Sequence, residues 1–262
     1  MNRMQETAVV EKEYATSGAL DIRRSLHVKY STNQEDFHRW VLRQYAFAPD
    51  MRILELGCGT AEAWKDADFV QNVLPEKAQL ILSDFSPGML ETAQKNVQKK
   101  NNVSFRQIDI QQIPYEDGVF DAVIANMMLY HVPDLPKALS EVRRVLKPGG
   151  IFYCATFGEN GLMGWLCDAL GLDRGKEQQN SFSLQNGKAS LTQYFSRVEM
   201  RVREDGLAVT STEDLVDYVL STAAFSDVKN RQRQEIYRLL DRFKVDGVIH
   251  IPKEYGMFVC RV

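Results

Sequence analysis

The sequence predicts an α/β protein with an open, doubly wound, mostly parallel sheet, and three observations support this. Apolar segments of strand length alternate with helical patterns from residue 51 to residue 156. The strand segments are continuously apolar, which is typical of strands that are buried on both faces. The first of them, "RILEL", runs directly into the glycine turn "GCG". Because ligands of such sheets bind beyond the carboxyl ends of the strands, this turn is the first candidate for a binding site.

The alternation gives five strands and three helices in order. The strands are expected at residues 52–56, 78–85, 103–110, 120–129 and 151–157. Helices follow the first, second and fourth strands, and each carries apolar residues at helical spacing. These stripes are Trp64, Ala67, Val70 and Leu74; Met89, Leu90, Ala93 and Val97; and Leu135, Ala138, Leu139, Val142 and Leu146. Ser86 is expected to cap the second helix, with Pro87 in its first turn.

The segments before residue 51 and after residue 157 do not continue the alternation of strands and helices. Residues 1–20 are weakly patterned, and a helix with Tyr45 on its apolar face is expected before Pro49. After Phe157, the glycine-containing residues 158–196 predict an inserted helix instead of another strand. The remaining residues predict a strand at 196–205, helices at 211–222 and about 229–244, and a strand at 256–262. These two strands suit an antiparallel edge of the sheet.

Composition and charge exclude several classes of function. The 262 residues carry a net charge of −3 and contain no dense Lys/Arg block, so nucleic-acid and anionic-membrane partners are not predicted. The four cysteines (Cys58, Cys154, Cys167 and Cys260) form no Cys-x-x-Cys pair, and the histidines are dispersed, so no metal site or disulfide framework is predicted. Without a long apolar segment, the protein is expected to be soluble and cytoplasmic.

The residues around the glycine turn restrict what it can bind. No lysine stands where a P-loop needs one, so a nucleoside triphosphate is excluded. Glu62 occupies the place of the third glycine of a dinucleotide-binding turn, which disfavours a pyrophosphate there. Glu55, just before the glycines, favours a positively charged ligand. S-adenosylmethionine carries an ammonium and a sulfonium at the end that would meet this acid.

Four motifs in this order resemble the class I S-adenosylmethionine-dependent methyltransferases, in particular the ubiquinone/menaquinone-biosynthesis-like group with a methyltransferase domain of type 11. They are "LELGCGT" (54–60), "LSDFSPGML" (82–90), "VSFRQIDIQQIPYEDGVFDAVIANMMLYHVPD" (103–134) and "ALSEVRRVLKPGGIF" (138–152). The resemblance implies a Rossmann-like, seven-stranded sheet with an antiparallel edge strand. It also implies an N-terminal helical cap over residues 1–48 and an S-adenosylmethionine-binding domain over residues 49–262, in which residues 158–196 complete the substrate pocket.

The resemblance assigns the donor site motif by motif. Its residues are Glu55, Gly57, Cys58 and Gly59 for the methionine end; Asp84 for both ribose hydroxyls; Phe85 and Met89 for the adenine faces; Asp109 and Ile110 for the adenine edge; and Asn126 and Met127 for the methyl-donor end. Ala61 stands where the family has its third glycine, a conservative departure.

Four further residues have less specific assignments. His131 follows the fourth strand, where it is either a general base or a histidine that packs in the loop before Pro133. Residues 23–41 resemble leader segments that fold over the cofactor in some members of the family, which makes Tyr14, His27 and Tyr30 candidate lid residues.

The expected function is therefore transfer of a methyl group from S-adenosylmethionine to an O, N or C nucleophile of a small-molecule metabolite. The reaction is an in-line displacement that releases S-adenosylhomocysteine and requires no metal. Two alternatives remain open. The fold can serve as a non-catalytic binding scaffold, and an NAD-dependent oxidoreductase shares the same strand, turn and helix arrangement, although Glu62 opposes it.

Overall fold

The computed structural model describes residues 17–97, 101–174, 182–222, 225, 228 and 230–262, with side chains from residue 22 onward. The chain forms two compact units. The sheet unit comprises Glu35–Phe157, Ser181–Val202 and Gly256–Val262. The accessory unit comprises Met1–Gln34, Gly158–Asn180 and Arg203–Tyr255. The predicted domain boundary at residue 48 and the predicted role of residues 158–196 in a substrate pocket stay predictions.

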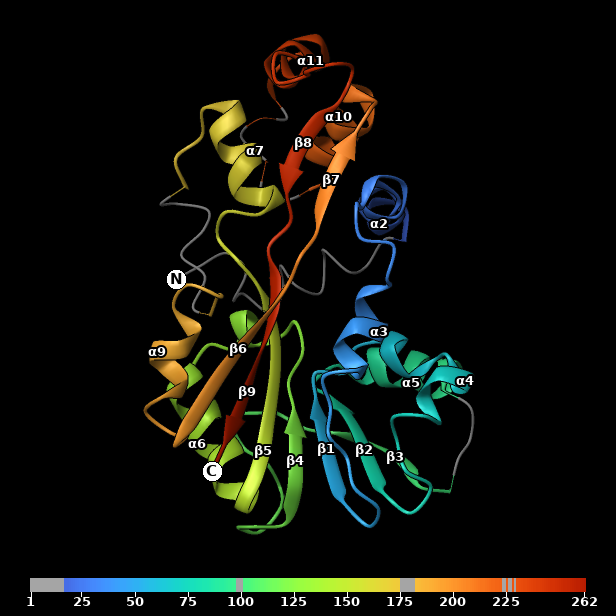
Figure 1. Ribbon diagram of the computed structural model, residues 1–262, viewed down its shortest axis with the longest axis vertical. Coiled ribbons are helices and arrows are strands. Elements are labelled where there is room, and N and C mark those ends of the chain that lie inside the picture. The colour runs from blue at the N-terminus through green and yellow to red at the C-terminus, as the bar shows by residue number, and fades with distance from the viewer. Residues whose placement is uncertain (1–16, 98–100, 175–181, 223–224, 226–227, 229) are drawn as a thin grey trace. The chain divides into compact units, whose positions relative to one another are not determined.

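A seven-stranded sheet organises the sheet unit, with the strand order β3-β2-β1-β4-β5-β9-β6. Strands β1 to β5 pair in parallel, and Figure 1 shows β9 running opposite to them beside the edge strand β6. The predicted fold class is thus confirmed. The strands are β1 (Arg52–Leu56), β2 (Gln79–Asp84), β3 (Val103–Gln107), β4 (Phe120–Ile124), β5 (Leu146–Phe157), β6 (Arg197–Arg203) and β9 (Tyr255–Arg261).

Both faces of the central part of this sheet are buried, because successive side chains along β1, β2, β4, β5 and β9 enter different hydrophobic clusters. In β1, Ile53 belongs to one cluster and Leu54 to the other. One cluster contains α6 (Leu135–Val145), and the other contains residues of α3 (Phe37–Leu42), α4 (Ala67–Val70) and α5 (Pro87–Asn96). A short helix, α9 (Gly187–Leu191), adds Leu191 to the α6 side.

The strand order reverses between β1 and β4, since the chain continues from β1 toward β2 and β3 on one side and from β4 toward β5 on the other. Such a reversal leaves a crevice at the carboxyl ends of the two strands. Glu55 lies in register with Leu82 of β2 and with Ile124 of β4. The predicted acid and the glycine turn that follows it therefore lie at this crevice.

Several predicted elements differ in the structure. The helix expected to carry Tyr45 ends at Leu42, so Tyr45 lies beyond it. The third strand ends at Gln107, three residues early, and β5 begins at Leu146, five residues early, so Leu146 belongs to β5 and not to the preceding helix.

The helix expected at 61–74 is instead a 3-10 turn, η2 (Glu62–Trp64), followed by the four-residue α4. Asp66 separates them, because its side chain caps α4 by accepting the backbone N–H of Phe69 at 3.2 Å. The fourth strand ends at Ile124, five residues earlier than expected, and the chain enters a second 3-10 turn, η3 (Leu129–His131).

The accessory unit has its own hydrophobic core and a second sheet that the sequence patterns did not predict. Strands β7 (Gly206–Val209) and β8 (Ile249–Pro252) pair antiparallel. With four residues each, they are at the lower limit of length for a strand signal from alternation. The α-helices in the described part of this unit are α2 (Ser17–Tyr30), α7 (Leu162–Leu170), α10 (Thr212–Ser221) and α11 (Arg233–Asp241). None of the helices in the described part of the chain is long and apolar enough to cross a membrane.

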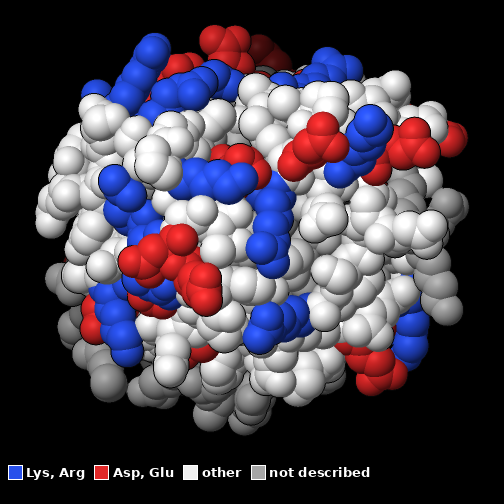
Figure 2. Space-filling model, turned by 90° about the horizontal axis from the view of Figure 1, so that it is seen from below, with Lys and Arg blue, Asp and Glu red and all other residues white. Residues whose placement is uncertain are grey.

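Charged side chains of both signs are intermixed on the face shown in Figure 2. This arrangement agrees with the low net charge of the whole sequence, −3.

A buried ionic cluster joins three chain segments of the accessory unit. The Asp205 carboxylate, whose side chain is fully buried, pairs with Arg203 and with Lys253, whose Nζ lies 2.7 Å away. The backbone N–H of Asn33 donates to the same carboxylate at 3.0 Å. Buried charges of this kind remain stable only while they compensate one another.

Replacing Asp205 by Ala should therefore lower the free energy of unfolding by about 3–5 kcal/mol, because Arg203 and Lys253 would keep their buried charges without a carboxylate. Urea denaturation measures this change. The exposed neighbour Glu204, replaced by Ala, is the matched control and should change stability by less than ~0.5 kcal/mol. Equal losses of stability in the Asp205 and Glu204 variants would show that the Asp205 carboxylate does not compensate the charges of Arg203 and Lys253.

Candidate functional site

The glycine turn follows β1 and needs its glycines for two different reasons. Gly57 (φ 68°) and Gly59 (φ 55°) both have left-handed backbone conformations, which glycine adopts without strain. A Cβ atom on Gly57 would also lie 2.8 Å from Cγ of Met128. Ala61 (φ 56°), at the place of the family's third glycine, is left-handed as well. The backbone N–H of Cys58 donates to the carbonyl of Ser83 at 2.8 Å, which ties the turn to β2.

Asp84 ends β2 and makes a direct hydrogen bond with this turn. Its Oδ2 accepts the backbone N–H of Gly59 at 2.8 Å, and its Oδ1 accepts the backbone N–H of Ser86 at 2.8 Å. The Ser86 hydroxyl caps α5 by accepting the N–H of Met89 at 3.4 Å. The cap predicted from sequence is thus confirmed, and Asp84 is held between the glycine turn and the first turn of α5.

Glu55 is almost completely buried, with 4% of its surface exposed. Its carboxylate accepts a hydrogen bond from the indole N–H of Trp64. Burial raises the pKa of Glu55 to about 7; the Trp64 hydrogen bond opposes this shift and the nearby charge of Asp84 adds to it. The pKa of the Cys58 thiol is raised for a related set of reasons, first burial and then the charges of Glu55 and Asp84. The turn therefore lies in an electronegative environment.

The end of β4 supplies the second side of the crevice. Asn126 accepts the backbone N–H of Ala155 at Oδ1 (3.1 Å) and donates from Nδ2 to the Tyr45 hydroxyl oxygen (2.6 Å). The next residue, Met127, has φ 53° although it is not glycine. A left-handed backbone conformation is uncommon for residues other than glycine. Such residues cluster at functional sites. A hydrogen bond from the Met127 N–H to the carbonyl of Ala155 (2.8 Å) holds this conformation.

Tyr45 is a residue of this region that the sequence patterns did not single out as part of the site. Its ring lies 4.9 Å from the ring of Tyr153 and stacks on Trp64 at 6.3 Å between centroids. Burial, and secondarily the Glu55 charge, raise its pKa well above the ordinary value. Its position in an apolar helical stripe predicted a packing role, and no local signal shows that its hydroxyl oxygen reaches Asn126.

The residues predicted to hold adenine follow β2 and β3. Phe85 is 58% exposed, and Met89 is partly buried. Asp109 accepts the backbone N–H of its neighbour Gln111 at 2.8 Å, and Ile110 is buried in the α6 side of the core. The adenine contacts of these residues stay predictions.

His131 lies in an aromatic group after β4. Its ring centroid is 4.5 Å from that of Tyr130, and Tyr130 in turn lies 4.6 Å from the ring of Phe157 at the end of β5. Met127 and Met128 are partly buried in the same hydrophobic cluster as Tyr130. The carboxyl ends of β4 and β5 thus present aromatic and thioether side chains. The catalytic role of His131 stays a prediction.

Two of the three candidate lid residues, His27 and Tyr30, lie in the described part of the accessory unit. Tyr14 lies outside the described residues. The Tyr30 hydroxyl donates to Asp214 at 2.7 Å, and the His27 ring packs edge-on against Tyr218 at 6.2 Å, so both contact α10. Burial lowers the pKa of His27 to about 4, and Lys253 contributes to the shift. Their proposed contact with a cofactor stays a prediction.

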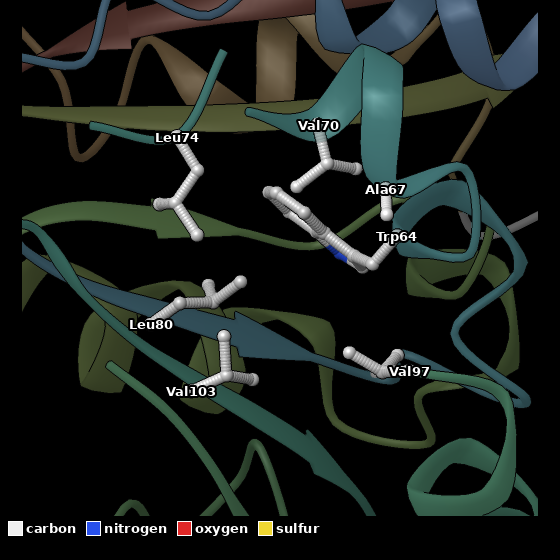
Figure 3. A pocket seen from close by; sticks show the side chains of 7 residues that line it. All are labelled: Trp64, Ala67, Val70, Leu74, Leu80, Val97 and Val103. Carbon is white, nitrogen blue, oxygen red and sulfur yellow. The ribbon is translucent and has the colours of Figure 1, made fainter. Parts of the chain in front are cut away.

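An apolar cavity of about 10 Å³ lies near η2 and α4 (Figure 3). Its lining residues are Trp64, Ala67, Val70, Leu74, Leu80, Val97 and Val103. Figure 3 shows the Trp64 ring extending from η2 among these aliphatic side chains. A space of this size holds at most one water molecule, and none of the lining side chains except the indole of Trp64 carries a polar group. We interpret it as a packing gap beside the site.

Comparison with known proteins connects this geometry to a family. Residues 54–154 match the model of the methyltransferase domain. The demethylmenaquinone methyltransferase of Symbiobacterium thermophilum is 35% identical over 123 residues, which cover 46% of this chain and 48% of that protein. The chain thus spans about half the length of the curated relatives it matches.

Solved structures share the fold at low sequence identity. The YcgJ protein of Bacillus subtilis has a TM-score of 0.56 and 18% identity, covering 86% of this chain and 97% of that chain. Phosphoethanolamine N-methyltransferase 2 of Haemonchus contortus was solved in complex with phosphomonomethylethanolamine and S-adenosylhomocysteine. It has a TM-score of 0.52 and 18% identity, and the match covers 86% of this chain and 52% of that chain.

The matched segment runs from the end of β1 to β5 and contains the glycine turn, Asp84 and the crevice between β1 and β4. The resemblance in the motifs is therefore confirmed for this segment: residues 54–154 match the methyltransferase domain and are similar to the demethylmenaquinone methyltransferases.

Proposed function

We propose that the protein transfers a methyl group from S-adenosylmethionine to a small-molecule nucleophile and releases S-adenosylhomocysteine. One observation carries the proposal: Glu55 and Asp84 present two carboxylates at one glycine turn. Within the described part of the chain, neither carboxylate forms an ion pair. An electronegative crevice of this kind suits a ligand that brings its own positive charge.

The residues present fit such a donor. At Gly59 an added Cβ atom would meet nothing within 4 Å, so the backbone of the turn is open to a ligand at this residue. In this proposal Glu55 binds the ammonium group, Asp84 accepts both ribose hydroxyls, and the exposed Phe85 covers one face of the adenine. When bound, S-adenosylmethionine supplies a methyl group that is already activated by the sulfonium. The protein's own contribution is then to align the two reactants and to exclude water.

The acceptor is proposed to be a small, largely uncharged aromatic compound. The aromatic and thioether side chains at the ends of β4 and β5 support this class, since they offer apolar contact. The name of the matched relatives supports it too, and demethylmenaquinone is the first acceptor to test. If the acceptor keeps its proton near neutral pH, His131 is the residue proposed to remove it.

Calorimetric titration with S-adenosylmethionine, S-adenosylhomocysteine and NAD tests the donor. Binding of the first two at micromolar concentration, with no heat from NAD, is expected. Heat from NAD alone would replace this proposal by the oxidoreductase alternative. Donor binding without turnover of any small-molecule acceptor would favour the scaffold alternative.

Replacement of Asp84 by Ala should raise the dissociation constant of S-adenosylmethionine about tenfold or more, because charge-assisted hydrogen bonds to the ribose are lost. The same calorimetric titration measures this. Glu116, an exposed acid between β3 and β4, replaced by Ala is the control and should bind like the unaltered protein. Unchanged affinity in the Asp84 variant would overturn the ribose assignment.

Donor affinity should fall by up to about tenfold between pH 7.5 and pH 6, because protonation of Glu55, with its pKa of about 7, removes the charge that binds the ammonium. Titrations across this range measure the effect. Glu55→Gln is the control, since it cannot titrate and retains only the pH dependence of the ligand's own amine. Parallel pH profiles of the two proteins would show that Glu55 does not bind the ammonium.

Glu55→Gln should also raise the free energy of unfolding of the ligand-free protein at high pH. Folding raises the pKa of Glu55 from its ordinary value of 4.5 to about 7, so its contribution to stability is complete below 4.5 and is lost as the pH rises through 7. Glu55→Gln should therefore raise the free energy of unfolding by on the order of 1–3 kcal/mol near pH 8, and by little near pH 4.5. Thermal melting without ligand at both pH values measures the difference, and a gain independent of pH would contradict it.

A further inference from the structure

We propose that Trp64 and Tyr45 are positioning residues of the donor site: they form one aromatic unit that holds the Glu55 carboxylate at the end of β1 and the Asn126 amide at the end of β4. This inference rests on the proposed function, because it assigns Glu55 and Asn126 to the methyl donor. Both aromatic residues belong to the sheet unit, and neither belongs to the motifs that identify the family.

Trp64 fixes Glu55 from the side of the core. The indole N–H is a donor only, and it donates to a Glu55 oxygen while the ring packs among Val70, Leu74 and Leu80. This hydrogen bond favours the charged form of the acid, in opposition to burial, which favours the neutral form. Trp64 therefore influences both the orientation of the carboxylate and the pH at which it carries its charge.

The packing around Trp64 explains why its indole has one orientation. Trp64 is 3% exposed and ends the 3-10 turn η2, whose first residue follows the left-handed Ala61. The carbonyl of Thr60, one residue before Ala61, accepts a hydrogen bond from the Asn96 side chain of α5 at 2.9 Å. The turn that carries the indole is thus held to a helix of the same unit, and the indole N–H remains directed at Glu55.

Tyr45 orients the Asn126 amide at the end of β4, as Trp64 orients the Glu55 carboxylate at the end of β1. Its hydroxyl oxygen accepts the Asn126 Nδ2–H group at 2.6 Å, while Asn126 Oδ1 accepts the N–H of Ala155 at 3.1 Å. With a partner at each end, the amide has one orientation. The position of Tyr45 is itself fixed, because the next residue, Ala46, donates its N–H to the Tyr153 hydroxyl at 3.0 Å and the two tyrosine rings are in contact.

The two contacts form one unit because the Tyr45 and Trp64 rings stack, with 6.3 Å between centroids and 17° between planes. The Glu55 charge also acts on the Tyr45 hydroxyl, whose pKa rises partly for that reason. The aromatic unit therefore connects the methionine end assigned to Glu55 with the methyl-donor end assigned to Asn126. A change at either ring should reach the donor without direct contact between that ring and the reacting atoms.

Trp64→Phe and Tyr45→Phe test the proposal, since each keeps a ring and removes one polar group. Trp40→Phe and Tyr115→Phe are the matched controls; the ring of Trp40 stacks on Phe37, and that of Tyr115 packs edge-on against Phe120. The dissociation constant of S-adenosylmethionine is measured for all four variants between about pH 6 and pH 8.5, where Glu55 is expected to titrate.

Trp64→Phe should weaken binding about tenfold at neutral pH and should move the midpoint of the pH profile upward, because the charged acid loses its donor. Tyr45→Phe should weaken binding about threefold to tenfold with little movement of the midpoint, since it releases Asn126 and not Glu55. The controls should match the unaltered protein. Affinities and midpoints of the test variants equal to those of the controls would overturn the proposal.

A measurement without ligand separates failure of this inference from failure of the proposed function. Trp64→Phe should destabilise the free protein more at pH 8 than at pH 5, whereas in the Glu55→Gln background the effect should not depend on pH. If this pH dependence is absent, the inferred hydrogen bond from Trp64 to the charged Glu55 carboxylate is wrong. If the dependence is present and the unaltered protein binds no S-adenosylmethionine, the contact stands while the proposed function and the positioning role both fail.

Discussion

The hydrogen bond from the Gly59 backbone N–H to the Asp84 carboxylate joins the turn after β1 to the end of β2, at 2.8 Å. The rest of the site depends on this contact. It forms in a turn whose two glycines, Gly57 and Gly59, both have left-handed backbone conformations. It requires the parallel register of β1 and β2, which brings both carboxyl ends to one edge of the sheet. Asp84 thereby has a fixed place beside Glu55.

Placing two carboxylates together in a partly buried crevice opposes stability. Burial of Glu55 favours its neutral form, and Asp84 adds to this preference. The surrounding structure compensates with N–H donors: Trp64 for Glu55, and the backbone of Gly59 and Ser86 for Asp84. A cation that enters the crevice would relieve the remaining repulsion. In the proposed donor site, affinity for a cationic ligand and the instability of the free site would thus have the same electrostatic origin.

The accessory unit has a different basis of stability. Its core is separate from the two clusters of the sheet unit and contains residues of α2, α7, α10, β7, β8 and α11. The buried Asp205 cluster joins three of its chain segments, at residues 31–33, 203–206 and 253. His27, one of the predicted lid residues, lies near the charges of Lys253 and Asp205. The lower density of recognisable motifs in this unit agrees with its absence from the segment matched by the family model.

The sequence by itself determined the sheet, the glycine turn, the Ser86 cap and the acids at strand ends, because these follow from local periodicity and from turn chemistry. Only the tertiary structure decided which groups meet. The Tyr45–Asn126 and Trp64–Glu55 contacts join residues 81 and 9 positions apart, and in the sequence both aromatic residues fit ordinary apolar stripes. The short β7 and β8 alternate over only four residues each, and their pairing with each other makes them a sheet. Periodicity shows that a side chain is buried, whereas packing in three dimensions determines what its polar atom faces.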